Sequence, residues 1–447
     1  MSRDLIDLVP PQERAILVGA PLKRTNARHA AVEHLEELGR LADTAGARVV
    51  GTLTQLIDRP DSSTYIGKGK VQELKDMLTE HDATVVIFDD ELSPAQGKNL
   101  EGELGKRVID RAELILDIFA LRAKSAEAKM QVELAQLEYS LPRLRNMWTH
   151  LEKFRGGIGV RGPGETQLET DRRLVGQRIA VLKERLIEVQ KSREVQRKNR
   201  RNAFRVALVG YTNAGKSSLL RALVRHGDRP DQRADGTDTP GLDIVVEDRL
   251  FATLDPLTRD VSLGTGATPL VVTDTVGFIR KLPHHLVASF RATLEEVREA
   301  DLLLHVIDSE NPAWEEHRLV VDEVLDELGV HDRPVLHVFN KTDALEPESL
   351  AAITERMTNL LPGSVFASAV APGGADSLVA ALRAASEEAR PLLRLRVPAA
   401  QGKLLAEIHR TSQVVAAEND EETGDVLLTV RADAAERGRW EQAGVVG

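Results

Sequence analysis

The sequence predicts a multidomain α/β protein with an N-terminal parallel α/β domain, an antiparallel helical hairpin, a second α/β domain and a small α+β C-terminal domain. Three observations predict this. Apolar strands alternate with amphipathic helical stretches over residues 14–110 and again over 204–390, two leucine-rich helical stripes lie between them, and residues 393–447 combine strands with one helical stretch. We therefore expect the domains to span residues 1–111, 112–203, 204–391 and 392–447.

The composition is that of a globular protein, with 42% hydrophobic and 29% charged residues in a chain of 447. It contains no cysteine, which excludes disulfides and thiolate metal sites. No apolar run approaches the roughly 20 residues that a membrane-spanning helix needs. The first residues are charged where a signal peptide would be apolar. We expect a cytoplasmic protein without a membrane span, and nothing in the sequence requires more than a monomer.

The N-terminal domain is predicted from the strands RAILVGA, RVVGTLTQ and TVVIFDD, with helices near residues 26–45 and 70–80 between them. This alternation is typical of a parallel sheet. The turn Tyr65–Lys70 (YIGKGK) is glycine-rich and basic and precedes a helix, where it could hold a phosphate. A plain turn is the favoured interpretation, because so short a pattern is weakly specific.

The helical hairpin is predicted from apolar residues that recur every three or four positions. The first stripe comprises Leu134, Leu137, Leu141 and Leu144, and the second comprises Val175, Ile179, Leu182, Leu186 and Val189. Each arm of about 30 residues would extend about 45 Å, and we expect Pro142 to kink or end the first arm. The stripes are interpreted as the packed interior of the hairpin.

The hairpin also concentrates positive charge in a chain whose net charge is −11. Residues 183–205 hold nine Lys/Arg against three Glu, a local charge of +6, and residues 143–161 hold five against one Glu, a local charge of +4. Contact with a polyanion and a solvated helix face both remain open. The predicted tip Arg155–Gln167 (RGGIGVRGPGETQ) has five glycines and is either a phosphate-contacting loop or a plain linker.

The most specific nucleotide motif is a phosphate loop that follows the strand FRVALVG and precedes an apolar helix. Backbone N–H groups of such a loop surround a β-phosphate, while Lys216 reaches the β- and γ-oxygens and the Ser217 hydroxyl ligates Mg²⁺. The residues predicted to contact nucleotide here are Gly210, Tyr211, Thr212, Asn213, Ala214, Gly215, Lys216, Ser217 and Ser218.

The end of the next buried strand adds a second motif, made of Asp274, Thr275, Val276 and Gly277. In this motif the carboxylate holds Mg²⁺ through water and the glycine N–H contacts the γ-phosphate. A threonine between the two motifs must also meet Mg²⁺ to sense the nucleotide state. Thr253 and Thr258 are both candidates, and their spacing does not choose between them.

A third motif identifies the base and consists of Asn340, Lys341, Thr342 and Asp343, after the strand VLHVFN. The Asp343 carboxylate can accept two hydrogen bonds from guanine, which adenine cannot donate, and an unpaired buried carboxylate is costly. Ser368 and Ala369 are expected to present backbone to the guanine O6. The segment 204–391 is therefore predicted to be a P-loop GTPase domain that hydrolyses GTP to GDP.

Several longer segments together resemble the HflX family of bacterial ribosome-associated GTPases. They are the phosphate loop GYTNAGKSS, LFATLDPLTR, DTVGFIRKLP, GGIGVRGPGETQLETDRR and the N-terminal YIGKGKVQEL, and they span nearly the whole chain. The resemblance implies that Ser217 and Thr253 ligate Mg²⁺ and that Lys216, Thr253 and Gly277 act in catalysis. It also implies that a first switch contacts the nucleotide through Phe251, Ala252, Thr253, Leu254 and Asp255.

The family resemblance also implies a partner and a task. Its members bind the large ribosomal subunit, with the N-terminal domain and the hairpin facing ribosomal RNA, and are implicated in splitting stalled or idle ribosomes under stress. Two departures from the family pattern are visible. The connection Val224–Asp243 is longer and more polar than usual, and Leu257 stands where a small hydroxyl residue is usual.

Two hypotheses concern the hydrolysis step. Phe278 follows Gly277 where many GTPases have a glutamine that orients water, so intrinsic hydrolysis is expected to be slow and stimulated by the ribosome. Asn213 is either a K⁺ ligand or a loop-stabilising side chain. The alternative functions are an RNA-remodelling ATPase with a regulatory GTPase domain, and a signalling GTPase switch for a protein partner.

Overall fold

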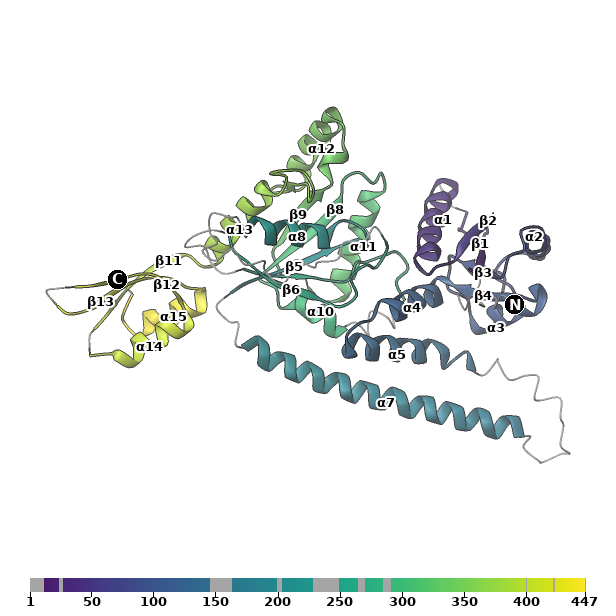
Figure 1. Ribbon diagram of the computed structural model, residues 1–447, viewed down its shortest axis with the longest axis horizontal. Helices are drawn as coiled ribbons and strands as arrows, with labels where there is room; N and C mark the ends of the chain where they lie inside the picture. Colours follow the sequence, from purple (N-terminus) through teal and green to yellow (C-terminus); the bar gives the residue numbers. More distant parts are fainter. Residues whose placement is uncertain are drawn as a thin grey trace, which may run out of the picture. The chain divides into compact units, whose positions relative to one another are not determined.

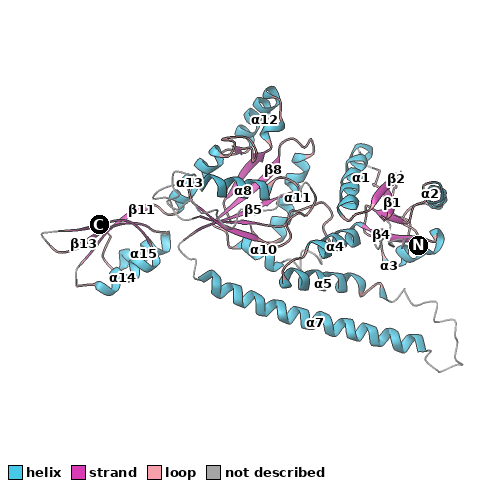
Figure 2. Cartoon of the chain, viewed as in Figure 1, coloured by secondary structure: helices cyan, strands magenta, loops and turns pink. Residues whose placement is uncertain are grey.

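The structure is a computed structural model, shown in Figures 1 and 2. It describes residues 12–23, 27–144, 163–198, 203–227, 249–263, 270–283, 291–330, 332–398, 400–420 and 423–446. The chain divides into two compact units. Unit 1 comprises Met1–Glu188, Arg249–Phe251 and Lys281–Arg291, and unit 2 comprises Val189–Asp248, Ala252–Arg280 and Ala292–Gly447.

The sheet of unit 1 is parallel, with strand order β2-β1-β3-β4. Its strands are β1 (Arg14–Gly19), β2 (Arg48–Thr54), β3 (Val85–Phe88) and β4 (Arg107–Asp110). The helices between and after them are α1 (Ala27–Thr44), α2 (Lys68–Glu80), α3 (Pro94–Leu104) and α4 (Arg111–Arg122). Residues of α2 and α3 share a buried cluster with Ile16 and Val18 of β1 and Phe88 of β3. The parallel α/β architecture predicted from the sequence is therefore confirmed.

The hairpin is built from α5 (Ala126–Ser140) and α7 (Pro163–Lys198), of which α5 and residues 163–188 of α7 belong to unit 1. The two helices lie side by side (Figure 1). Leu134 of α5 and Leu182 and Leu186 of α7 form its small buried cluster, with the partly buried Leu137 and Ile179 packed against it. The other predicted stripe residues are partly buried and lie outside this cluster: Leu141, Leu144, Val175 and Val189. Ion pairs from Arg178 to Glu133 and from Lys183 to Glu138 flank this cluster.

Two details of the hairpin differ from the expectation. The first arm is not one helix of about 30 residues, because α4 ends at Arg122 and Ser125 caps the start of α5 by accepting a hydrogen bond from the Ala128 N–H. The glycine-rich tip is shorter than expected, since α7 already begins at Pro163, and proline is tolerated in a first helical turn. Residues 145–162, which carry most of the smaller basic cluster, lie outside the described residues.

Unit 2 contains a six-stranded sheet of order β10-β9-β8-β5-β7-β6. Its strands are β5 (Phe204–Gly210), β6 (Leu257–Val261), β7 (Leu270–Asp274), β8 (Leu302–Asp308), β9 (Val335–Asn340) and β10 (Val365–Phe366). Its helices are α8 (Lys216–Gly227), α10 (Arg291–Arg298), α11 (Trp314–Glu327), α12 (Pro347–Leu360) and α13 (Asp376–Ala389). All neighbouring strands are parallel except β6, which pairs antiparallel with β7.

Parallel strands in unit 2 place several motif residues at one edge. Gly210, Asp274 and Asn340 are the last residues of β5, β7 and β9. Ligands of open parallel sheets bind outside these carboxyl ends. The main core lies on the side of α8 and α13, where Leu208 and Val306 pack against Leu219 and Leu382.

The C-terminal part of unit 2 is a three-stranded antiparallel sheet of order β11-β13-β12. Its elements are β11 (Leu392–Val397), α14 (Gly402–Thr411), β12 (Gln413–Asn419), β13 (Val426–Arg431) and α15 (Ala434–Gln442). The helix α15 was not expected, although Asp433 and Glu436 form a capping box at its start. Trp440 of α15 is buried against Leu395 and Ile408.

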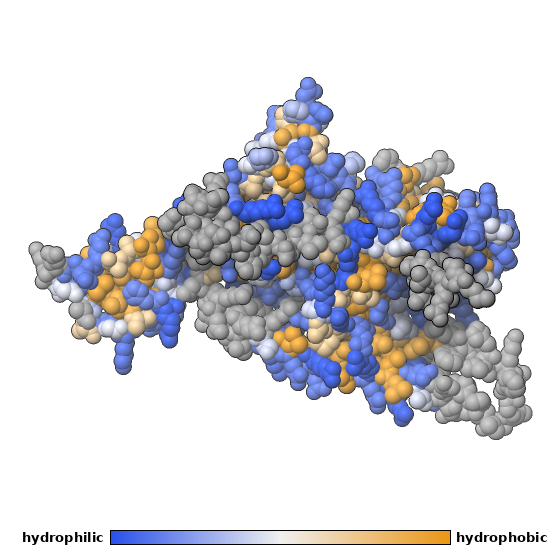
Figure 3. Space-filling model, viewed as in Figure 1, coloured by the Kyte–Doolittle hydropathy of each residue, from blue (hydrophilic) through white to orange (hydrophobic). Residues whose placement is uncertain are grey.

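The surface drawn in Figure 3 is largely hydrophilic, as the composition of a globular protein predicts. Hydrophilic residues dominate the face drawn in Figure 3, interrupted by apolar patches. On α7, large apolar residues are exposed at Leu174, Val181 and Ile187. Among the described residues, no helix is both long and apolar enough to cross a membrane.

Candidate nucleotide-binding site

The phosphate loop joins β5 to α8 and requires glycine at two positions. Gly210 has φ of +153°, and a Cβ there would collide with the carbonyl oxygen of Val306 on β8. Gly215 has φ of +90°, and a Cβ there would collide with the Asn340 side chain. Asn213 also adopts the left-handed region, at φ of +62°, which asparagine tolerates better than most residues. The loop is therefore pressed tightly against β8 and the end of β9.

Lys216 lies at the centre of this loop. Its Nζ donates hydrogen bonds to the carbonyl oxygens of Gly210, at 3.1 Å, and Tyr211, at 2.8 Å. Burial lowers the pKa of Lys216 to about 8, and the nearby Asp274 carboxylate opposes this shift. Two backbone carbonyls thus hold the ammonium group in place.

Three oxygen-bearing side chains meet beside Lys216. The Ser217 hydroxyl donates to Asp274 Oδ2 at 2.6 Å and lies 2.9 Å from Thr253 Oγ1. Burial raises the pKa of Asp274, and Lys216 opposes that shift. The second carboxylate oxygen, Oδ1, is buried and has no hydrogen-bond partner among the described residues. The site therefore offers two hydroxyl oxygens and a carboxylate with one oxygen that accepts no hydrogen bond from the described residues. Oxygen ligands of this kind are the ones that Mg²⁺ prefers.

The two candidate threonines are placed differently. Thr253 reaches Ser217, as described, whereas the Thr258 hydroxyl lies 3.1 Å from that of Thr273 across the β6–β7 pair. Phe251, which the family resemblance placed in the first switch, belongs to unit 1. Its ring is buried and stacks edge-on against Phe119, with centroids 4.6 Å apart. Of these residues, the structure brings only Thr253 to the Ser217 and Asp274 oxygens.

The segment after Asp274 pairs with the phosphate loop. The Thr275 hydroxyl donates to the carbonyl oxygen of Leu208 at 2.6 Å. Thr212 N–H donates to the Phe278 carbonyl at 2.7 Å, and Phe278 N–H donates to the Gly210 carbonyl at 3.1 Å. Gly277 lies so close to Thr212 that a Cβ would clash with its Cα. The Phe278 side chain is buried and offers no polar atom to a water molecule.

The base motif is assembled at the ends of β9 and β10. Asn340 Nδ2 donates to the Ala214 carbonyl of the phosphate loop at 2.9 Å. The Ser368 hydroxyl donates to Asp343 Oδ1 at 2.5 Å and accepts from the N–H of Ala371 at 2.9 Å. Thr342 is fixed by a hydrogen bond to the Ala367 carbonyl at 3.0 Å. The side chains of Asp343 and Ser368, 25 residues apart in the chain, are therefore joined directly.

Sequence reasoning missed several supporting residues. Asp308, the last residue of β8, binds Lys341 Nζ at 2.7 Å, and a polar residue ending a buried strand is the signal that could have found it. The Tyr211 ring stacks on His317 of α11 with centroids 3.7 Å apart. Arg280 pairs with Glu316 of the same helix at 3.0 Å. No local pattern marks these last two contacts.

A parallel α/β sheet with a phosphate loop, an aspartate ending the adjacent strand and an Asn-Lys-Thr-Asp motif defines the class of P-loop GTPases. Comparison with known proteins narrows this class. Family profiles match residues 32–120, described as "GTP-binding GTPase N-terminal", residues 122–200, described as "GTP-binding GTPase Middle Region", and residues 205–341, described as "50S ribosome-binding GTPase".

Individual relatives match over most of the chain. The GTPase HflX of Magnetococcus marinus is 42% identical over 439 residues, covering 97% of this chain and 96% of its own. The GTPase HflX of Escherichia coli (strain K12) is 44% identical over 405 residues and 90% of each chain. A GDP complex of a GTP-binding protein from Sulfolobus solfataricus is 25% identical, with a TM-score of 0.43 and coverage of 84% and 99%. The chain belongs to the HflX family of GTPases and hydrolyses GTP.

Proposed function

We propose that this GTPase binds the large ribosomal subunit and splits or rescues stalled and idle ribosomes, with GTP governing residence and hydrolysis permitting release. The observation that carries the proposal is the match of residues 205–341 to a family described as a 50S ribosome-binding GTPase. The charge of α7 supports it, because Lys183, Arg185 and Lys191 are exposed in a protein of net charge −11.

In this proposal the parts of the chain divide the work. Residues 1–111 and the hairpin at 112–203 face ribosomal RNA, residues 204–391 bind and hydrolyse the nucleotide, and residues 392–447 form an appendage. The protein acts as a monomer. Its nucleotide contacts are the three motifs predicted from the sequence, the backbone of Ser368 and Ala369, and the first switch around Thr253.

Magnesium fits the site through Ser217 and Thr253, with Asp274 behind them. When bound, this ion neutralises charge on the β- and γ-phosphates. The chain's own groups do the rest of the work. Lys216, held by the carbonyls of Gly210 and Tyr211, would exchange them for phosphate oxygens. Gly277 would contribute its backbone N–H to the γ-phosphate.

The residue after Gly277 cannot orient the water molecule that attacks the γ-phosphate. Phe278, the residue directly after Gly277, is apolar and buried, and both its backbone N–H and its carbonyl are bonded to the phosphate loop. A group supplied or ordered by the ribosome completes the site, so turnover is slow without it. Single-turnover hydrolysis with and without large subunits tests this, and equal rates would remove the stimulation from the proposal.

Asn213 has two alternative roles, as a ligand of a second cation or as a residue that shapes the phosphate loop. Its positive φ supports a role in shaping the loop. A K⁺ ligand at this position would place a cation where other GTPases receive an arginine finger. The cation role predicts faster hydrolysis in K⁺ than in Na⁺ at equal ionic strength, whereas equal rates leave Asn213 with the structural role alone.

Cosedimentation with large subunits in GTP, GDP or a non-hydrolysable analogue tests the partner itself. We expect association with the triphosphate forms and little with GDP. A Lys183→Gln/Arg185→Gln double variant should reduce the slope of log affinity against log salt by roughly 2. The matched control is Arg356→Gln/Arg383→Gln, which removes two exposed charges from α12 and α13. Salt-insensitive binding, or no association with any nucleotide, contradicts the proposal.

A further inference from the structure

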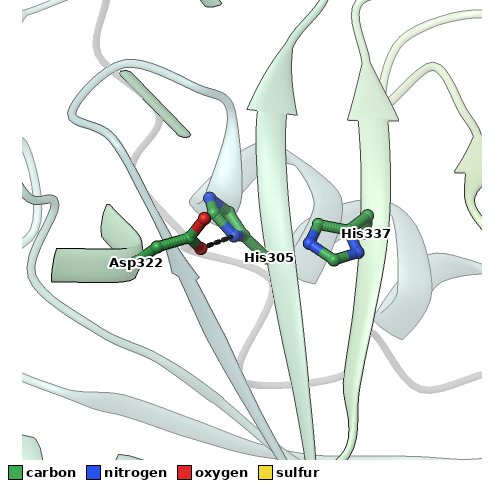
Figure 4. A group of neighbouring side chains, drawn as sticks. All are labelled: His305, Asp322 and His337. Carbon is green, nitrogen blue, oxygen red and sulfur yellow. Dashed lines mark ion pairs between the residues drawn. The ribbon is translucent and has the colours of Figure 1, made fainter. Parts of the chain in front are cut away.

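Two histidines and an aspartate gather in unit 2 on the sheet face covered by α11 (Figure 4). His305 lies on β8 and His337 on β9, and the two residues are direct partners in the parallel register. Paired positions send their side chains to the same face. Their ring centroids are 5.4 Å apart, and Asp322 reaches toward them from α11. This group belongs to none of the nucleotide motifs.

The geometry is close to that of a metal-binding cluster. One potential ligand atom from each residue lies within 4.8 Å of the other two. Ligands around tetrahedral zinc stand about 3.4 Å apart, given bond lengths of roughly 2.1 Å. Asp322 and His337 are partly exposed, and Asp322 sits on a helix surface, so these two side chains have room to close the remaining distance.

His305 is the anchor of the group and supplies the independent observation. Its side chain is 1% exposed, and its Nδ1 has no hydrogen-bond partner in the described part of the chain. Asp322 Oδ1 lies 3.4 Å from that nitrogen, an ion-pair distance without the alignment of a hydrogen bond. Buried polar atoms are normally satisfied. An orphaned imidazole nitrogen aimed at a carboxylate oxygen is what a metal ligand would leave in its absence.

The surroundings also orient the carboxylate of this cluster. Arg318 binds Asp322 Oδ2 at 2.7 Å, which leaves Oδ1 directed at His305. Such an outer partner orients a metal-binding carboxylate. The chain has no cysteine to compete for a soft metal.

We propose that His305, Asp322 and His337 form a binding site for a divalent transition metal of the zinc class. Two imidazoles and one carboxylate suit zinc, whereas Mg²⁺ prefers oxygen ligands. The partly exposed side of the cluster leaves the fourth position to water.

The site would fasten α11 to β8 and β9. The same helix carries His317, stacked on Tyr211 of the phosphate loop, and Glu316, paired with Arg280 beyond Asp274. The metal therefore stabilises the helix that supports the nucleotide site and takes no part in hydrolysis. This inference does not depend on the ribosomal partner.

The test uses the full-length protein, stripped with a chelator and then saturated with Mg²⁺ and GDP so that the nucleotide site is occupied. ZnCl₂ binding is measured by calorimetry, and Co²⁺ is added separately to record its visible absorption. We expect one equivalent of zinc bound with micromolar or tighter affinity, a higher Tm with zinc than without, and cobalt bands typical of four or five ligands.

The variants decide the assignment. His337→Gln and Asp322→Asn remove partly exposed ligands, so folding is retained, and each should weaken zinc binding at least tenfold. The control His409→Gln removes an exposed histidine from α14 and should leave binding unchanged. Absence of stoichiometric zinc in the wild-type protein, or equal binding in His337→Gln and His409→Gln, overturns the proposal.

Discussion

The hydroxyl oxygens of Ser217 and Thr253 lie 2.9 Å apart, although 36 residues separate them in the chain. Ser217 is fixed in the first turn of α8, whereas Thr253 lies in an irregular segment before β6. Both hydroxyls stand beside the buried Asp274 carboxylate. Ser217 on a helix and Thr253 on a connecting segment therefore meet at the same carboxylate. A site that distinguishes two nucleotide states needs such a contact between a fixed residue and a residue of a segment that can change its position.

Replacing Thr253 and Thr258 one at a time should show which of them is the switch threonine. Thr253→Ala removes a hydroxyl from the oxygen cluster, so we expect GTP turnover to fall roughly 10- to 100-fold and the Mg²⁺ requirement to rise. Thr258→Ala is the matched control, because its hydroxyl contacts only Thr273 among the described residues, and should change turnover less than about twofold. Steady-state GTPase assays across a Mg²⁺ titration make the comparison. A larger loss in Thr258→Ala would assign the switch to that residue instead.

Changing Asp343 should change the preferred base. Asp343→Asn leaves guanine facing an amide in place of the carboxylate, so GDP affinity should fall at least about 100-fold. Xanthine carries an oxygen where guanine has its 2-amino group, so the asparagine amide can donate to it. Competition binding with GDP and xanthosine diphosphate measures the switch. A variant that keeps its preference for GDP would show that Asp343 does not read the base.

Nucleotide affinity should depend on pH through Lys216. Its pKa is lowered to about 8, so the nucleotide-free protein loses this charge as pH rises through 8, and affinity for anionic GDP falls. From pH 7 to 8.5 we expect a loss of roughly fourfold, measured without Mg²⁺. The stability of the empty protein moves in the opposite direction, because the folded state releases this proton before the unfolded chain does. Lys216→Ala should abolish the pH dependence in this range, and a dependence that persists would assign it to another group.

The hairpin should depend on a single leucine. Leu182 is fully buried between α5 and α7, in a cluster too small to compensate for a cavity. Leu182→Ala should cost about 2–4 kcal/mol of local stability. Ile187→Ala on the same helix, where the side chain is 50% exposed, should cost less than about 0.5 kcal/mol. Hydrogen exchange of α5 and α7 amides reports both values, and equal protection in the two variants would show that the stripe does not hold the hairpin.

Local motifs explain why much of the nucleotide site could be predicted. The backbone of the phosphate loop lies too close to β8 and to Asn340 for a Cβ at Gly210 or Gly215. The spacing of these two glycines in the sequence therefore predicts the loop. Alternating strands and helices force a parallel sheet, which brings Asp274 and Asn340 to one edge. These inferences rest on neighbours within a few residues.

Pairings over long separations could not be predicted in the same way. The choice of Thr253 over Thr258 as the neighbour of Ser217 depends on where an irregular segment folds, and the antiparallel edge strand β6 gives no separate signal. The break at Ser125 depends on a capping contact that competes with helix continuation. The His305–Asp322–His337 cluster requires the register of β8 against β9 and the rotation of α11.

By itself, the sequence determined the class of the protein, the three nucleotide motifs and the residues that form them, because short-range geometry and side-chain chemistry constrain such motifs wherever they occur. Only the tertiary structure decided which distant side chains face one another: Thr253 with Ser217, Asp343 with Ser368, and Asp322 with His305. Packing of helices on a sheet sets those distances, and the free energy of packing is shared among many residues that no single motif contains.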